Sequence, residues 1–178
     1  MDKREVLNHL ARARTQLLAA IEDLSETEMT TLPMSGAWTL QKVLAHISGW
    51  AAWDLEAITA IQQGKSPDLS GILDVATFNN RLVAERKEWS LGQILAEMED
   101  TQIAILVLVD SISERNLFEV GSYQGPYWNS LAKWLQVAWE HEEEHATQIQ
   151  VWRGQRKSGD RSNSRGKEGG SFLSQEAR

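Results

Sequence analysis

The stretch that decides the fold is 134–152, WLQVAWEHEEEHATQIQVW, near the end of the 178-residue chain. Wound as a helix at about 100° per residue, it places one stripe of apolar and imidazole side chains on a single face: Trp134, Ala138, His141, His145, Ile149 and Trp152. Spacings of three and four residues over this length predict an amphipathic helix. Two histidines therefore lie one turn apart in the middle of the face that turns toward the core.

The same helical period recurs upstream of this stretch. A first helix is predicted from the inward series Val6, Leu10, Ala13, Leu17, Ile21 and Leu24. After a loop that contains Pro33 and Gly36, Thr39 is predicted to cap a second helix that runs to about Gln63. No run alternates with period two for long enough to predict a sheet.

Three further helix starts are visible in the sequence. Asp74 is predicted to cap a short segment that reaches Trp89, and Ser90 with Gln93 reads as a capping box for a fourth long helix. Asn129 is predicted to cap the last helix, which should run to Arg153 and stop at Gly154. The pattern predicts an all-α fold, an up-and-down four-helix bundle with a short extra helix.

Composition divides the chain into a bundle domain, 1–153, and a tail, 154–178. The tail is rich in glycine and serine, and we expect it to be disordered and weakly basic, with six basic and three acidic side chains. The bundle domain carries 12 basic and 22 acidic side chains. Because an acidic surface lacks a phosphate-binding footprint, we expect no nucleic-acid partner.

Other absences narrow the chemistry. The chain contains no cysteine, which excludes disulfides, thiolate zinc sites, iron–sulfur clusters and a thiol nucleophile of its own. The longest purely apolar run, 103–109, is far shorter than the roughly 20 residues of a spanning helix. The first residues lead into an amphipathic pattern instead of a signal core. We expect a cytoplasmic protein with no membrane partner.

The histidines are the candidate metal ligands. His141 and His145 can share one ion, as in helical zinc sites, although a hydrogen-bonded pair in the core is the alternative. His46 lies at the edge of the apolar face of the second helix and would complete a set of three. Three nitrogens with an open fourth position are typical of a catalytic zinc-type site. His9 falls about 100° from its helix's apolar stripe and is predicted to be a surface residue.

Two carboxylates flank this set. Glu142 lies beside the histidine stripe on the core side, and Asp54 lies on the inner face of the second helix. Each is predicted to orient a ligand or move a proton, with a core-edge hydrogen bond or salt bridge as the alternative. The residues 141–145 also match the His-Glu-x-x-His pattern of zinc proteases, with Glu142 as base. A protease is disfavoured because no third ligand follows downstream and no sheet is predicted.

At this point the residues resemble a known family. The segment 38–47, WTLQKVLAHI, together with His141-x-x-x-His145 resembles the DinB-like four-helix-bundle superfamily, in which a Trp-Ser/Thr-x-x-x-x-Leu-x-His helix start and a C-terminal histidine pair hold a divalent metal. The middle section, from Phe78-Asn79-Asn80 through Arg86 to Ser90-Leu91, is similar to the ClbS/DfsB branch. The resemblance implies a bundle, usually dimeric, that binds zinc or nickel through His46, His141 and His145.

Two functions follow as expectations. The resemblance implies a metal-dependent enzyme, either a hydrolase or a transferase that uses an exogenous low-molecular-weight thiol such as bacillithiol or mycothiol. Its substrate would be a small reactive electrophile, in detoxification or stress, and its assembly a homodimer. The alternative is a non-catalytic metal-binding or interaction bundle. Trp50, Trp53 and Trp134 can wall a pocket or pack the core, and the loop 123–128 is a candidate lid.

Overall fold

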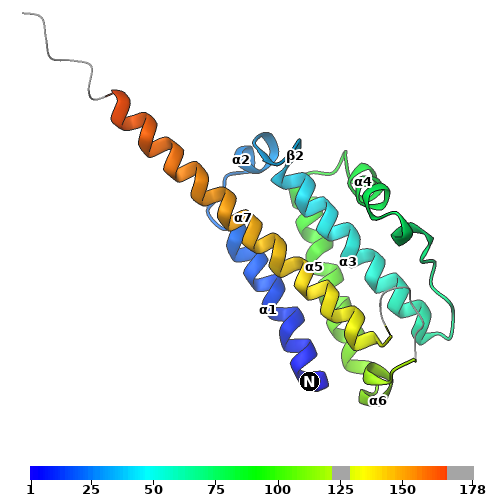
Figure 1. Ribbon diagram of the computed structural model, residues 1–178. Helices are drawn as coiled ribbons and strands as arrows, with labels where there is room; N and C mark the ends of the chain where they lie inside the picture. The colour runs from blue at the N-terminus through cyan, green and yellow to red at the C-terminus, as the bar shows by residue number, and fades with distance from the viewer. Residues whose placement is uncertain (122–128, 168–178) are drawn as a thin grey trace, which may run out of the picture.

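The computed structural model describes residues 1–121 and 129–167. Four long helices form the bundle: α1 (Lys3–Ile21), α3 (Leu40–Gln62), α5 (Leu91–Ser111) and α7 (Leu131–Lys167) (Figure 1). Shorter elements connect them: α2 (Glu26–Thr31), the strands β1 (Pro33–Ser35) and β2 (Trp38–Thr39), a 3-10 turn (Ser70–Leu73), α4 (Val75–Glu85) and α6 (Glu114–Phe118). The predicted all-α fold class is confirmed, since the only sheet among the described residues is one short antiparallel pair.

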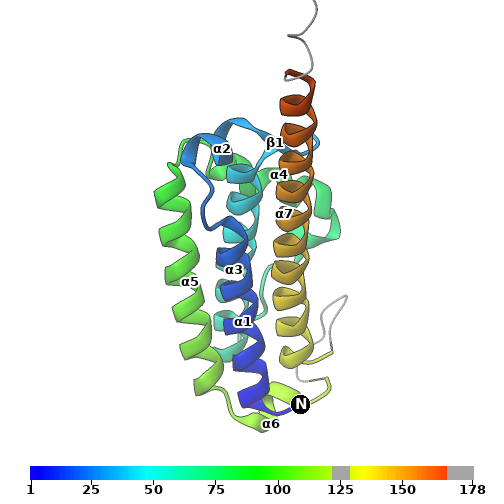
Figure 2. The ribbon, with the colours of Figure 1, turned by 90° about the vertical axis from the view of Figure 1, so that its left-hand side faces the viewer.

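The four long helices do not alternate strictly in direction. Val6 of α1 and Leu131 of α7 share one core cluster, while Leu40 of α3 and Leu91 of α5 share the other. The first residues of α1 and α7 thus lie at one end of the bundle, and those of α3 and α5 lie at the opposite end (Figures 1 and 2). The directions are up, down, down and up, because α4 packs along α3 and carries the chain back before α5 begins.

The predicted caps of three helices are confirmed. Thr39 Oγ1 accepts from the Lys42 N–H at 3.4 Å at the start of α3. Asp74 starts α4 by accepting from the N–H of the third residue that follows it. Ser90 and Gln93 form a reciprocal capping box at the start of α5. Each cap satisfies backbone N–H groups that have no partner within the helix, which is why the sequence located these starts correctly.

The segment between α1 and α3 is more structured than the sequence predicted. Asp23 has a φ of 66°, so α1 ends at Ile21 and not near Leu24. A capping box on Ser25 then begins α2. The strands β1 and β2 form a small hairpin, whose Pro33 carbonyl accepts from the indole N–H of Trp152 at 3.0 Å. This contact ties the chain just before α3 to the middle of α7.

The last helix differs from its predicted ends. The side chain of Ser130 accepts from the N–H of Lys133 at 3.3 Å, so the prediction that Asn129 caps α7 is wrong. The helix also continues past Gly154, so the predicted end at Arg153 is wrong.

The helical backbone of α7 crosses the predicted domain boundary at residue 153 and runs to Lys167 (Figure 1), while the division into a bundle domain and a disordered tail stays a prediction. A glycine inside a helix costs only about 1 kcal/mol relative to alanine. Arg156 helps to offset that cost, because its guanidinium donates to Glu28 at 2.8 Å and lies 4.7 Å from the Trp152 ring. The rest of the predicted tail, 168–178, lies outside the described residues. Within the described part of the chain, no helix is long and apolar enough to cross a membrane.

Gly49 is required where α4 packs on α3. A Cβ at this position would lie 2.8 Å from Leu82 Cβ and 3.0 Å from Arg86 Nη1. We expect Gly49→Ala to lower the free energy of unfolding by about 1–3 kcal/mol, the usual cost of overpacking, in urea titrations followed by far-UV circular dichroism. Gly92→Ala is the matched control on α5, because its nearest neighbour would be Ser90 Oγ at 3.8 Å. Equal stability of the two variants would contradict this close approach.

Candidate metal centre

Three histidines from two helices meet at the centre of the bundle. His46 lies two turns after the start of α3, and His141 and His145 lie one turn apart on the facing side of α7. The Nε2 atom of His141 is 3.0 Å from Nε2 of His46 and 3.0 Å from Nε2 of His145. All three ligand atoms lie within 4.8 Å of one another. The structure therefore brings together the three histidines that the sequence singled out.

Their surroundings keep these imidazoles uncharged. Burial, with a smaller contribution from His145, lowers the pKa of His46 to about 4. Burial also lowers the pKa of His141 to about 3, with smaller contributions from His145 and His46. The pKa of His145 is lowered as well, mainly by burial. Since metals bind the neutral imidazole, near neutral pH each ring is in the form that offers a lone pair.

Hydrogen bonds decide which nitrogen faces the centre. His145 Nδ1 lies 3.1 Å from Gln148 Oε1, which can only accept, so the proton is on Nδ1 and the Nε2 lone pair faces the other two rings. His46 Nδ1 is buried, and no hydrogen-bond partner for it exists among the described residues. Leaving such a group unpaired costs about 1–3 kcal/mol, and a bond from Nε2 to a cation would offset that cost.

The donor set fits a divalent metal. Three converging nitrogens meet the requirement of zinc-type sites for borderline-soft ligands in a roughly tetrahedral arrangement with one position left open. Without a cation, Nε2 of His141 would face the Nε2 atoms of His46 and His145. A neutral His141 ring can donate at most one proton from this nitrogen, so it cannot form a full hydrogen bond to both neighbours. A single ion at the meeting point of the three Nε2 atoms satisfies all three lone pairs.

Two tryptophans flank the cluster. The Trp38 ring centroid is 5.7 Å from that of His46, and the Trp50 ring lies 6.4 Å from His46 and 6.1 Å from His141. Trp53 packs instead against Trp134 at 5.3 Å, away from the histidines. Of the three predicted pocket tryptophans, Trp50 therefore contacts the site directly, and Trp53 is part of the core.

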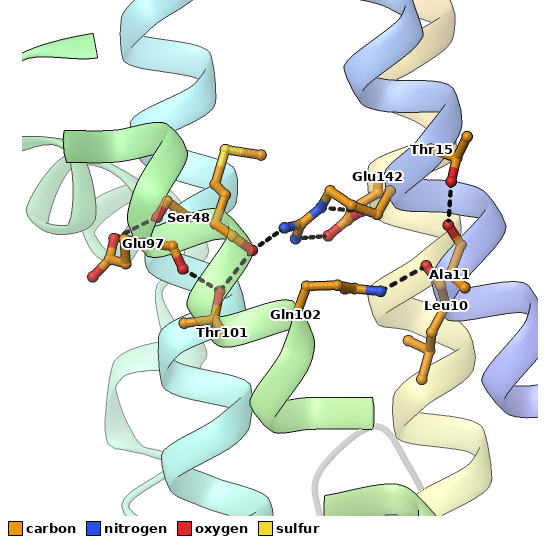
Figure 3. A network of polar contacts seen from close by, with 10 residues as sticks. Leu10, Ala11, Thr15, Ser48, Glu97, Thr101, Gln102 and Glu142 are labelled. Atoms are coloured by element: carbon orange, nitrogen blue, oxygen red, sulfur yellow. Dashed lines mark hydrogen bonds and ion pairs between the residues drawn. The ribbon is translucent and has the colours of Figure 1, made fainter. Parts of the chain in front are cut away.

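The side chain of Glu142 takes part in a polar network that links α7 with α1 and α5 (Figure 3). Its Oε2 accepts from Arg14 Nε at 3.0 Å, and its Oε1 accepts from a second guanidinium nitrogen. Arg14 also donates to the backbone carbonyl of Met98 on α5. Both carboxylate oxygens are thus occupied by an ion pair, which corresponds to the salt-bridge alternative raised for this residue. Its role in moving a proton stays a prediction.

Asp54 is buried one turn beyond Trp50 on α3. Its Oδ1 accepts from the indole N–H of Trp134 at 2.7 Å. Burial raises the pKa of Asp54 to about 7; the Trp134 hydrogen bond acts in the opposite direction, and the charge of Glu142 adds a smaller increase. The partner is therefore an indole and not a histidine, and the carboxyl holds its proton up to near neutral pH.

The remaining sequence candidates lie apart from the cluster. His9 is half-buried and stacks on Trp139 at 4.9 Å, so it contributes no ligand to the cluster. The third histidine, His46, lies upstream of the other two, unlike the downstream ligand of the protease pattern. The candidate lid, 123–128, lies outside the described residues.

Two residues of the site were missed in the sequence. Arg14 lies next to Ala13 and Leu17 in the inward series of α1, and a basic residue at that place signals a buried partner. Gln148 lies three residues after His145, a spacing that puts the two on one helix face. Neither signal identifies the partner, because that depends on which helices are neighbours.

The fold and the cluster define a class, a helical bundle with a three-histidine candidate metal centre in its core. The sequence profile described as the DinB superfamily matches residues 9–149, and the chain belongs to that superfamily. The recognition of this superfamily from the histidine spacing is thus confirmed. No curated protein matches the chain in sequence.

Solved structures with the same fold have little sequence in common with the chain. An uncharacterised protein of Escherichia coli UTI89 has a TM-score of 0.78 at 13% identity, over 88% of this chain and 95% of that one. The Sibling Lethal Factor Precursor DfsB has a TM-score of 0.74 at 17% identity, over 88% and 97%. The colibactin self-resistance protein ClbS, in complex with double-stranded DNA, has a TM-score of 0.75 at 11% identity, over 85% and 95%. The similarity to the ClbS/DfsB branch therefore extends to the fold.

The complex of ClbS corrects one prediction. The acidic balance of the bundle was expected to exclude a nucleic-acid partner, and that exclusion is wrong, because a protein of this fold is found with double-stranded DNA. Net charge is a sum over the whole surface, whereas phosphate contacts depend on where individual Lys and Arg side chains lie. An acidic total is compatible with a local basic surface.

The two arginine–glutamate pairs between α1 and α7 should differ sharply in their effect on stability. Arg14 and Glu142 are 6% and 12% exposed, whereas Arg12 and Glu143 are 59% and 33% exposed. We expect Arg14→Met to lower the free energy of unfolding by about 3–5 kcal/mol, because it leaves a buried carboxylate unpaired. Arg12→Met, the matched control, should cost less than about 1 kcal/mol. Similar urea midpoints for both variants would show that burial of the first pair is not what matters.

Proposed function

We propose that the chain binds one divalent metal ion, zinc or nickel, through His46, His141 and His145 and is a metal-dependent enzyme. The observation that carries this proposal is the convergence of three neutral Nε2 atoms on one point in the core. Membership of the DinB superfamily supports it, since that superfamily is often metal-binding. Three protein ligands leave a coordination position for a small molecule.

The reaction we propose is the attack of water or an exogenous low-molecular-weight thiol on a small reactive electrophile. A bound divalent ion lowers the pKa of a water or thiol at its open position. Because the chain has no cysteine, any thiol must come from outside. ClbS is a colibactin self-resistance protein, and as part of the proposal we extend a resistance role to this chain, with a small reactive electrophile as its substrate.

The residues around the cluster have separate tasks in this proposal. Gln148 holds the proton of His145 on Nδ1 and so keeps Nε2 free. Trp38 and Trp50 cover the histidines from the side of α3 and exclude bulk water. Arg14 binds the residue after His141 and keeps this face of α7 turned inward. A small-molecule substrate and a homodimer stay predictions.

Removing any ligand should abolish tight binding of the metal. We expect His46→Ala, His141→Ala and His145→Ala each to weaken binding of Zn²⁺ at least about 100-fold, because two imidazoles bind far more weakly than three. His9→Ala is the control, since His9 stacks on Trp139 outside the cluster. The measurement is a competition titration with a chromophoric chelator, together with elemental analysis of the purified proteins. Equal zinc content in all four variants would refute the assignment of these three histidines as metal ligands.

A second measurement separates the enzyme from a non-catalytic metal bundle. The cobalt-substituted protein should change its visible spectrum when a small thiol is added, because an open position exchanges its ligand. If cobalt is bound stoichiometrically but its visible spectrum does not change when thiols or other small ligands are added, the non-catalytic alternative is favoured.

Gln148 should tune the affinity without being a ligand. Loss of an outer hydrogen bond to a metal-binding histidine typically costs 10–100-fold in affinity. We expect Gln148→Ala to weaken Zn²⁺ binding by roughly tenfold, near the lower limit because this side chain is exposed. Gln148→Glu should restore binding, since a carboxylate accepts the same proton. Gln150→Ala, another exposed glutamine of α7, should bind as the wild type does, and a loss as large there would refute the role of Gln148.

A further inference from the structure

A cavity of about 460 Å³ opens beside the histidines, between α3, the turn before α4, and α7. We call it the side cavity. Its walls are mainly apolar, and they come from Trp50, Ile72, Val75, Trp134, Val137 and Ala138. Its volume lies within the roughly 300–1,000 Å³ of typical small-molecule pockets. One wall is His141, so a molecule in the side cavity would lie directly against the candidate metal centre.

Few polar side chains line the side cavity. Lys133 lies in its lining with an exposed side chain, and its ammonium group donates to Gln136 Oε1 at 3.0 Å. Asp54, in contrast, is 6% exposed and lies at the inner wall, where Oδ1 accepts from the Trp134 indole. This leaves Oδ2 as the group of Asp54 that a ligand can address. A neutral carboxyl donates one hydrogen bond from that oxygen.

The lining also disfavours a negatively charged ligand deep in the side cavity. Burial raises the pKa of Asp54 to about 7, and the surrounding walls are mainly apolar, so a negatively charged group would be poorly solvated at this inner wall in the metal-free chain. An uncharged ligand with an acceptor group meets both the apolar walls and the one donor.

We propose that the side cavity is the substrate pocket and that it takes an uncharged, mainly apolar or aromatic molecule whose carbonyl or similar acceptor binds Asp54 Oδ2. Asp54 is then a specificity-determining residue that positions the substrate beside His141. This inference rests on the proposed function, because only an enzyme would have the bound molecule as its substrate. Binding of the molecule in the side cavity does not itself require the metal. It differs from the predicted roles of Asp54 as a residue that orients a metal ligand.

A second, larger cavity provides a comparison, because it lacks the polar groups that distinguish the side cavity. The groove between α1 and α5 has a volume of about 750 Å³ and is lined by residues such as Ala19, Leu18 and Ile103. None of the three histidines and no fully buried carboxyl lines this groove. It therefore serves as the control site for the same substitutions.

The test uses prodan, an uncharged naphthalene ketone whose emission moves to longer wavelength when its carbonyl accepts a hydrogen bond. Full-length protein, with and without one equivalent of Zn²⁺, is titrated at about pH 6, where Asp54 is protonated. We expect one prodan per chain. Ala138→Phe on α7 and Val75→Trp on the α4 side should each weaken binding at least about tenfold by filling the side cavity. The controls Ala19→Phe and Ile103→Trp make the same changes in the groove and should bind as the wild type does.

Substitutions of Asp54 test the hydrogen bond itself. Asp54→Ala should weaken prodan binding by about tenfold and shift the bound emission to shorter wavelength. Asp54→Asn keeps both an acceptor for Trp134 and a donor toward the cavity, so it should restore affinity and emission. A merely structural role of Asp54 would change affinity without the wavelength shift.

The outcomes distinguish this inference from the proposed function. If the filled variants bind prodan as well as the wild type, or if the groove variants lose it equally, the side cavity is not the pocket. If Asp54→Ala leaves the emission unchanged, the assignment of the donor is wrong. Loss of the metal site, judged by chelator competition, would overturn the proposed function while leaving the prodan result intact, because the metal-free chain is measured in parallel.

Discussion

The buried pair between Arg14 and Glu142 is the contact on which the arrangement of the site depends. One guanidinium joins α1 to the carboxylate on α7 and to the Met98 carbonyl on α5. A buried pair of this kind adds little stability over apolar packing, but separating its partners costs several kcal/mol. Because Glu142 directly follows His141, any rotation of α7 that moved the histidines out of the core would also break the pair. The ion pair therefore specifies which face of α7 is buried.

The opposite side of the site is determined by backbone contacts. The Thr39 cap sets where α3 starts, and the Trp152 indole holds the hairpin before it against α7. These contacts fix the register between the two helices that carry the histidines. With register and rotation both set, Nε2 of His141 lies 3.0 Å from Nε2 of His46 and 3.0 Å from Nε2 of His145, an arrangement that suits one shared ion better than three rings alone. The side cavity then adjoins this point because α4, and not a long helix, covers that part of α3.

Sequence reasoning succeeded where the signal is local. The caps at Thr39, Asp74 and Ser90 act within three residues and were predicted correctly. The placement of His141 and His145 on one face of α7 also follows from local helical spacing, and their Nε2 atoms lie 3.0 Å apart. It failed where two local signals compete. Gly154 was taken as the end of α7, but a single glycine inside a helix costs only about 1 kcal/mol, the contacts of Arg156 help to offset that cost, and the helix continues. The exclusion of a nucleic-acid partner failed for a different reason. Net charge is one sum over the surface and does not tell where the Lys and Arg side chains lie.

By itself, the sequence determined that the chain is a helical bundle, which faces of its helices turn inward, and that three histidines lie on those faces. It also determined that any thiol chemistry needs a thiol from outside, since no cysteine is present. Only the tertiary structure decided that Glu142 belongs to Arg14 and Asp54 to Trp134, and that the chain returns through α4 and leaves a cavity beside His141. The physical reason is that periodicity and capping are properties of one helix, whereas the partner of a buried polar group depends on which helices lie side by side.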